Sequence, residues 1–284
     1  MEFRPPQREV IPPVVKNLLI INVLVFIATA VIGKQGIDIS DYLALHHWSS
    51  DKFRIWQLLT HMFMHGDVGH ANALYDEGFM HLFSNMFGLW MFGSILEQYW
   101  NSKRFLIFYL LCGFGAALLH LGVLSFQYHQ LHQAISAFNA HPDVNAFSQL
   151  FHKYHLENIT PFSEFKSEWL KYPTDDRFAG TAKSLLDQYY TLQINEPTVG
   201  ASGAVFGILF GFGFLFPNTI MMLLFLPIPI KAKYFVAMYA LFELYSGISN
   251  SAGDNIAHFA HLGGMIVAFI IIKYWNMTNR KTLY

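Results

Sequence analysis

Long apolar segments alternate with polar ones along most of this chain. A helix that crosses a membrane needs about 20 mostly apolar residues. Segments near this length predict six transmembrane helices, at about residues 17–33, 78–98, 105–126, 200–217, 230–248 and 255–273. The fifth is the weakest because Glu243 lies inside it. The pattern therefore predicts an all-α integral membrane protein with a six-helix bundle in residues 1–275 and a tail at 276–284.

The segment 127–197 differs from the rest because it is rich in charged residues and histidines and has no spanning run. Its polar and apolar positions predict amphipathic helices at 145–157 and 174–192, the second capped by Thr174. Because it connects the third and fourth predicted spans, we expect it to be a helical insert outside the membrane. A long structured connection is more often functional than idle.

Lysine and arginine residues predict the orientation of the bundle, because they are enriched in cytoplasmic loops. One set of short loops and ends carries most of them, whereas the opposite short loops hold Lys34, Lys52 and Arg54. Both termini are therefore expected in the cytoplasm, and the insert on the extracytoplasmic side.

The overall composition agrees with a membrane protein. Hydrophobic residues make up 54% of the chain and charged residues 13%, against about 25% charged residues in soluble proteins. A net charge of −1 and the lack of a basic patch with interleaved aromatic residues argue against a nucleic-acid partner. The single cysteine, Cys112, excludes a disulfide framework and a thiolate metal cluster.

Ser202 is a candidate nucleophile because it stands alone among very small residues at the start of the fourth predicted span. Gly203, Gly207 and Gly211 follow at intervals of four and form one smooth stripe on a helix, which lets a neighbouring helix approach closely. Taken alone, this stripe is most simply a packing feature.

Other polar residues are expected at the same depth. In the predicted topology they lie one or two turns below the outer ends of their helices, in one slab of roughly 10 Å: Ser202, His81, Asn85, His258 and His261. Serine needs a base to become a good nucleophile, and His261 is the natural candidate, with His258 three residues earlier as the alternative. His81 and Asn85 are spaced i, i+4, so both can donate hydrogen bonds to one oxyanion. All four could instead be structural hydrogen-bonding groups.

A metal site is the competing interpretation of the histidines. His61, His65, His70 and His81, with His258 and His261, could supply zinc ligands. No compact ligand motif such as HExxH is present, so we expect neither a metal nor another cofactor.

The motifs together resemble the rhomboid family of intramembrane serine proteases. Gly200-Ala201-Ser202-Gly203, Ala260-His261-Leu262-Gly263-Gly264, and His81 with Asn85 carry the resemblance. Segments around Gly93 and Glu97, 216–218 and 227–233 are similar to bacterial members.

The resemblance implies a six-helix bundle around a water-filled cavity and a Ser–His dyad without an aspartate. It assigns Ser202 as nucleophile and His261 as general base, with an oxyanion hole formed by His81, Asn85 and the Ser202 backbone N–H. It also implies substrates that are single-span membrane proteins in the lipid bilayer. The expected location is a bacterial inner membrane, with the active site open to the extracytoplasmic side.

Three features depart from the family pattern. Trp56-Gln57 stands where Trp-Arg is common, which puts the anchoring of the first outer loop in doubt. The stretch between His65 and His81 is longer than usual, and the insert at 127–197 replaces a short connection. We expect the insert to cap or flank the mouth of the cavity.

Two other functions are compatible with this scaffold. One is a rhomboid-like factor that binds membrane proteins, or acts in their quality control, without cleaving them. The other is a transporter of small ions or metals that uses the outer histidines. Retention of Ser202 and His261 favours the protease.

Overall fold

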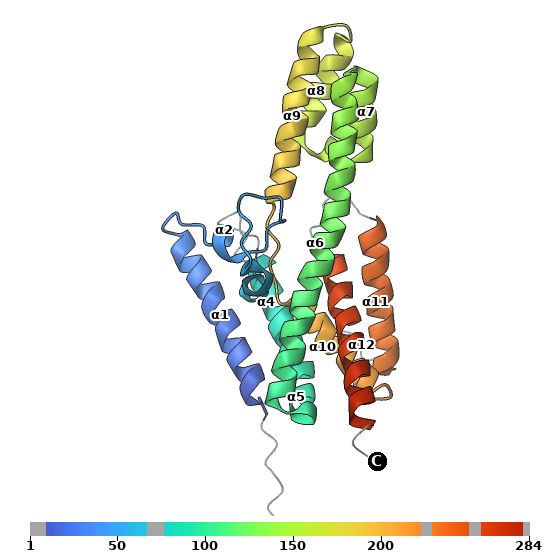
Figure 1. Cartoon of the computed structure of the whole chain (residues 1–284). Helices are drawn as coiled ribbons and strands as arrows, with labels where there is room; N and C mark the ends of the chain where they lie inside the picture. The colour runs from blue at the N-terminus through green and yellow to red at the C-terminus, as the bar shows by residue number, and fades with distance from the viewer. Residues whose placement is uncertain (1–9, 67–76, 223–228, 250–256, 281–284) are drawn as a thin grey trace, which may run out of the picture.

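The computed structural model describes residues 10–66, 77–222, 229–249 and 257–280, and almost all of its regular structure is helical. Figure 1 shows a helical bundle with a smaller group of helices at one end. The bundle contains α1 (Pro13–Gly33), α4 (Glu77–Gly88), η2 (Leu89–Gly93), α5 (Ser94–Trp100), α6 (Ser102–Ala140), α10 (Ser202–Leu215), α11 (Ala232–Ser249) and α12 (His258–Arg280). The start of α1 and the end of α12 lie at the end opposite the insert (Figure 1).

Four helices among the described residues are long and apolar enough to cross a membrane: Pro13–Gly33, Gly78–Trp100, Ser102–Ala140 and His258–Met277. The second is one continuous helix formed by α4, the π-helical turn η2 and α5. The prediction of an all-α membrane bundle is therefore confirmed. The number six stays a prediction, since α10 is shorter than a usual span and α11 is not among the four.

Helix α1 begins at Pro13, four residues before the predicted start, because a buried glutamate binds its first turn. The Glu97 carboxylate accepts hydrogen bonds from the backbone N–H groups of Val14 at 3.0 Å and Val15 at 2.8 Å. Ser102 donates a third bond, at 2.6 Å. A carboxylate at a helix N-terminus satisfies free N–H groups and complements the helix dipole. Glu97 therefore ties α1 to α5.

Helix α10 lies at the centre of the bundle, and its glycines set the distances to its neighbours. A Cβ added at Gly203 would lie 2.4 Å from the Ala116 Cβ of α6, and one added at Gly207 would lie 2.7 Å from the Cys112 Cβ. On the α12 side, a Cβ at Gly264 would lie 1.8 Å from the carbonyl oxygen of Gly203. The predicted close approach along the glycine stripe is confirmed.

The first outer loop contains α2 (Ser40–Leu43), α3 (Gln57–Thr60) and the 3-10 turn η1 (His61–Phe63). Gln57 is fully buried and organises this loop. Its side-chain oxygen accepts from the backbone N–H groups of His46 and Arg54, and its nitrogen donates to the carbonyls of Asp41 and Lys52. The neutral Gln57 thus anchors the loop in place of the arginine common in the family.

The prediction that the third helix ends near residue 126 is wrong, because α6 continues to Ala140. No proline interrupts Ser102–Ala140, and the first one follows at Pro142. The change from apolar to amphipathic composition marks where α6 leaves the apolar part of the bundle, and the helix itself does not end there.

The insert is completed by α7 (Val144–Lys153), η3 (Leu156–Asn158), α8 (Thr160–Lys171) and α9 (Asp176–Asn195), which pack with the end of α6. Its core is aromatic and includes Phe138, Phe147, Phe162 and Trp169. Helix α8 was not predicted. The cap of α9 is Asp175, whose carboxylate accepts from the Arg177 N–H, so the assignment of Thr174 is wrong by one residue.

A short antiparallel pair, β1 (Ile220–Met222) with β2 (Pro229–Lys231), precedes α11. Residues 230 and 231, which were predicted to begin the fifth helix, belong to this pair. Pro229 cannot donate a backbone hydrogen bond and fits such an edge position.

Candidate active site

Ser202 is the first residue of α10 and is half-buried. The chain enters the helix through Gly200, whose φ of +126° is accessible to glycine but strained for other residues. The Gly200 N–H donates to the carbonyl of His61 at 2.9 Å, and the nearby Leu45 and Thr198 form a backbone bridge. The first outer loop therefore holds the segment that presents Ser202.

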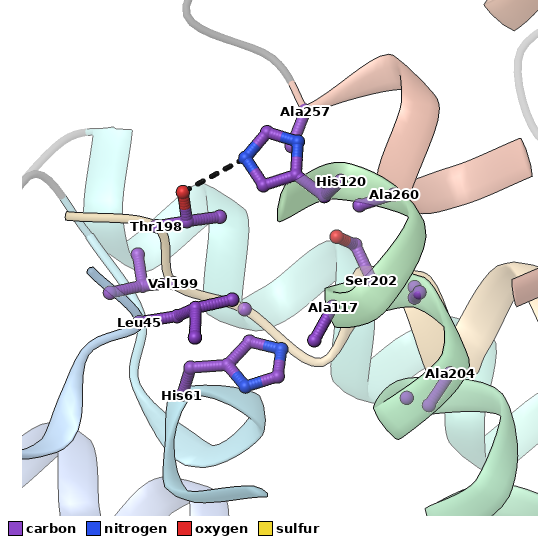
Figure 2. A pocket seen from close by; sticks show the side chains of 14 residues that line it. Leu45, His61, Ala117, His120, Thr198, Val199, Ser202, Ala204, Ala257 and Ala260 are labelled. Carbon is purple, nitrogen blue, oxygen red and sulfur yellow. Dashed lines mark hydrogen bonds between the residues drawn. The ribbon is translucent and has the colours of Figure 1, made fainter. Parts of the chain in front are cut away.

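A small pocket adjoins this serine. Figure 2 shows the Ser202 hydroxyl pointing into it, with Ala117 of α6 close by and His120 and His61 on opposite sides. His120 Nε2 is 3.0 Å from Thr198 Oγ1. The centre of a water molecule can occupy a volume of ≈ 10 Å³ in this pocket. By the same measure, a cavity needs at least about 10–15 Å³ to hold one water molecule. The pocket is therefore about the size of a single water molecule.

His261 is buried on α12 beside the start of α10. Its ring stacks on Phe206 with centroids 4.1 Å apart and planes 6° apart. Phe206 lies one turn after Ser202 on α10, and a Cβ at Gly203 would contact the Ala260 carbonyl at 3.4 Å. The structure thus brings the segments that carry Ser202 and His261 together.

Glu243 was not predicted to belong to this site. It is 4% exposed on α11, and its Oε2 lies 2.6 Å from His258 Nδ1 and 2.9 Å from His261 Nδ1. The sequence showed it only as a charge that weakens a predicted span. A charged residue inside a span is by default a functional candidate, and that signal could have identified it. The same applies to His120 on α6.

His81 and Asn85 lie on α4, and the His81 ring is close to Gly200. A Cβ at Gly200 would be 2.9 Å from His81 Nε2 and 3.5 Å from Ser202 Oγ, so the His81 ring and the serine hydroxyl border the same small space. Asn85 is buried and donates one N–H to the His81 carbonyl at 2.8 Å. An amide nitrogen carries two N–H groups, so Asn85 keeps one donor for another acceptor.

The outer histidines are held by protein groups. His61 Nδ1 is 2.8 Å from the Gln57 carbonyl, and His65 Nε2 is 2.8 Å from Asn22 Oδ1. His47 Nε2 is 2.8 Å from Ser125 Oγ, and burial lowers the pKa of His47, which favours a neutral ring at pH 7. These contacts give three of the outer histidines a structural role.

The structure gathers ligand-type side chains elsewhere. Within the described residues, the group with ligand atoms close enough to share an ion is Glu243, His258 and His261, whose atoms lie within 4.8 Å of one another. His61, His65 and His81 do not form such a group in that part of the chain, and His70 lies outside the described residues. If a metal bound here, it would be coordinated by the nitrogen of His261 that now contacts Glu243.

Comparison with known proteins identifies the family. The Rhomboid domain model matches residues 52–134 and 143–276. RHOMBOID-like protein 12, mitochondrial, of Arabidopsis thaliana is 25% identical over 259 residues, covering 90% of this chain and 56% of that protein. Rhomboid protease GlpG of Salmonella choleraesuis (strain SC-B67) is 31% identical over 103 residues, covering 35% of this chain and 32% of that protein.

These two relatives differ in source, and this chain spans about half or less of the length of each. The bacterial origin therefore stays a prediction. The family match covers most of the chain, including most of the insert and the segments around Ser202 and His261. The chain belongs to the rhomboid family.

Proposed function

We propose that this chain is an intramembrane serine endopeptidase, with Ser202 as nucleophile and His261 as general base. The observation that carries the proposal is the position of Ser202, which faces a water-sized pocket while Phe206, one turn later, stacks on His261. Acyl transfer needs a hydroxyl whose proton a nearby imidazole can take, and the packing of α10 on His261 supports that pairing.

The reaction divides into two steps. Ser202 Oγ bonds to the carbonyl carbon of the scissile peptide while His261 takes the hydroxyl proton. His261 then gives this proton to the leaving amine as the peptide C–N bond breaks. Water hydrolyses the resulting ester with the same histidine as base. The peptide bond is thus cleaved without a cofactor.

The developing oxyanion needs donors at the start of α10. The first N–H groups of a helix have no partner inside the helix, which makes the backbone N–H of Ser202 available. The His81 ring borders the same space, and the second amide N–H of Asn85 has no acceptor among the residues that the structure describes. Such donors stabilise the transition state because charge forms where they already point.

The substrates we propose are single-span membrane proteins in the lipid bilayer, cleaved near their extracytoplasmic ends. Both termini of the enzyme lie in the cytoplasm in this proposal. The start of α1 and the end of α12 lie at the same end of the bundle, which agrees with both termini on one side of the membrane, and the bias of lysine and arginine residues assigns that side.

The test uses the purified full chain in detergent, a panel of single-span substrates and a serine-directed phosphonate probe. Ser202→Ala and His261→Ala should each lower cleavage by several orders of magnitude, as losing a member of such a unit does. Ser94→Ala, at a buried serine of α5, is the matched control and should retain activity.

The same assay separates the alternatives. Cleavage by wild type that survives EDTA and disappears in Ser202→Ala supports the protease. Binding of the substrates without cleavage or probe labelling would favour a binding factor. An active His261→Ala with an inactive His258→Ala would move the base to His258.

A further inference from the structure

A third polar side chain, on a separate helix, contacts the histidine of the proposed Ser–His dyad. Glu243 of α11 is buried, and one of its two carboxylate oxygens, Oε2, lies within 2.9 Å of Nδ1 of both His258 and His261. Burying a carboxylate in an apolar bundle is unfavourable unless it is paired and hydrogen-bonded. The two imidazoles supply that pairing, and the proposed dyad alone does not explain why the charge is there.

The helices are shaped to bring this carboxylate to the ring. One turn after Glu243, α11 carries Gly247, where a Cβ would lie 3.2 Å from the His258 Cβ and 3.1 Å from the Phe259 ring. The missing side chain at Gly247 therefore allows α11 and α12 to approach at this level. On the opposite helix, Phe206 fixes the plane of the His261 ring. Stacking leaves rotation within that plane open, and the bond to Glu243 fixes it.

The bond also fixes the position of the proton. An ionised carboxylate only accepts hydrogen bonds, so the nitrogen that contacts Glu243 must carry a hydrogen. Neutral His261 is then the Nδ1–H tautomer, and its lone pair lies on Nε2. A base needs that lone pair directed at the serine. When Nε2 takes the Ser202 proton, the resulting imidazolium lies directly beside a negative charge.

We propose that Glu243 is a positioning residue that selects this tautomer of His261 and stabilises its protonated form, which makes the dyad a Ser202–His261–Glu243 triad. The inference rests on the proposed protease function and adds a group that the dyad lacks. His258 serves as the second donor to the same oxygen and holds the carboxylate in place. The carboxylate accepts no proton during the cycle.

Kinetics provide the first test. Glu243→Gln should lower kcat at least about 10²-fold with little change in KM; loss of the acidic member of comparable triads costs roughly 10⁴-fold. Glu243→Asp should recover part of the rate.

Glu97→Gln is the matched control, since it neutralises another buried glutamate whose partners are backbone N–H groups of α1 and the hydroxyl of Ser102. It should lower the unfolding temperature and leave kcat and KM unchanged. If Glu243→Gln behaves like Glu97→Gln, the triad is wrong and Glu243 only stabilises the fold.

The tautomer is measured independently of activity. With ¹⁵N-histidine in the wild-type full chain, the resonances lost in His261→Ala assign the ring, and the Nδ1–H form should predominate. An Nε2–H ring in wild type would overturn the inference even if no Glu243 variant folds. Zinc bound to the purified wild type and lost in Glu243→Gln would overturn it too, since the cluster would then be a metal site.

Failure of the proposed function gives a different result. A wild-type chain that neither cleaves nor reacts with the phosphonate probe, yet shows the Nδ1–H ring, contradicts the protease while the Glu243–His261 contact stands. A chain that cleaves through Ser202 with unchanged kinetics in Glu243→Gln contradicts only the triad.

Discussion

The membrane bundle and the insert are both helical, yet their helices pack by different means. In the bundle, glycines of α10 and α12 bring backbones together, and buried polar groups such as Glu243 and His261 lie between helices. In the insert, amphipathic helices close over an aromatic core that includes Phe147 and Trp169.

The surroundings explain the difference. Water drives apolar side chains together, so large rings stabilise the insert. Lipid tails are as apolar as the side chains, and association in a membrane depends on close packing and interhelical hydrogen bonds. Each region uses the packing that suits its surroundings, and substitutions of opposite kind should therefore disrupt each one.

The largest effect is expected for Phe147→Ala in the insert. Phe147 is fully buried and contacts Phe138, Phe162, Phe165 and Trp169. Removing such a ring costs about 3–5 kcal/mol, so limited proteolysis should cut within the insert. Leu170→Ala, at a side chain that is 53% exposed, is the control. Equal protease resistance of the two variants would contradict the aromatic core.

In the bundle, the corresponding substitution adds an atom. Gly264→Ala places a Cβ 1.8 Å from the Gly203 carbonyl oxygen, so α10 and α12 must separate. Overpacking costs about 3 kcal/mol at the upper end of its usual range, and the separation also displaces His261 from Ser202. The unfolding temperature and the cleavage rate should both fall. Gly122→Ala on α6, where nothing lies within 4 Å of an added Cβ, is the control and should lower neither the unfolding temperature nor the cleavage rate.

The polar groups of the bundle should act on turnover more than on stability. Asn85→Ala and His81→Ala should each lower kcat roughly 10²-fold if they donate to the oxyanion, and less if the donors are redundant. Substrate binding should change little. A lower unfolding temperature at unchanged kcat would show that Asn85 only packs its helix through the bond to the His81 carbonyl.

The role of the insert in substrate choice is tested by shortening it. Figure 1 places α7 and α8 at the end of α6 furthest from α10, so these helices do not cap the pocket, whereas the base of α9 leads directly to Ser202. Tyr128 of α6 donates to the Gln193 carbonyl, and Ser50 of the first outer loop donates to Asn195, so the base of α9 is tied to α6 and to that loop.

A Gly/Ser linker in place of residues 134–188 keeps these contacts. If the outer helices contact substrates, relative cleavage rates across a panel should shift while probe labelling of Ser202 stays constant. Unchanged relative rates would leave only the base of the insert with a bearing on the site.

The smallest effect sharpens the contrast between glycines. Gly180 lies inside α9 with nothing within 4 Å of an added Cβ. Alanine loses less conformational entropy in a helix, so Gly180→Ala should stabilise the insert by about 0.5–1 kcal/mol. Hydrogen exchange of α9 measures this change. A destabilised variant would mean that the glycine serves a contact after all.

The sequence predicted those parts of the molecule that leave a local pattern. Apolar runs located the long spans, and the interval of four between glycines located the close contact along α10. The continuation of α6 was missed because composition changes at the edge of the apolar layer while the helix does not end there. A helix ends near a residue that cannot continue it, and here that residue is Pro142.

The missed group of the candidate site depends on tertiary contacts. From the sequence alone, Glu243 is only an unfavourable charge inside a predicted span. Its partners, His258 and His261, are 15 and 18 residues away, and only the packing of α12 against α11 brings them to it. Similarly, Gln57 lacks the charge of the common arginine, and only the folded loop shows that its amide meets four backbone groups.

The unbroken helix α6 has a mechanical consequence. At a rise of 1.5 Å per residue its 39 residues extend roughly 58 Å, about twice the 30 Å of a hydrocarbon layer. Its inner part lines the pocket with Ala116, Ala117 and His120, and its outer part supplies Leu131, Ile135 and Phe138 to the insert core. With no proline between these two parts, one continuous helix joins the pocket wall to the core of the insert.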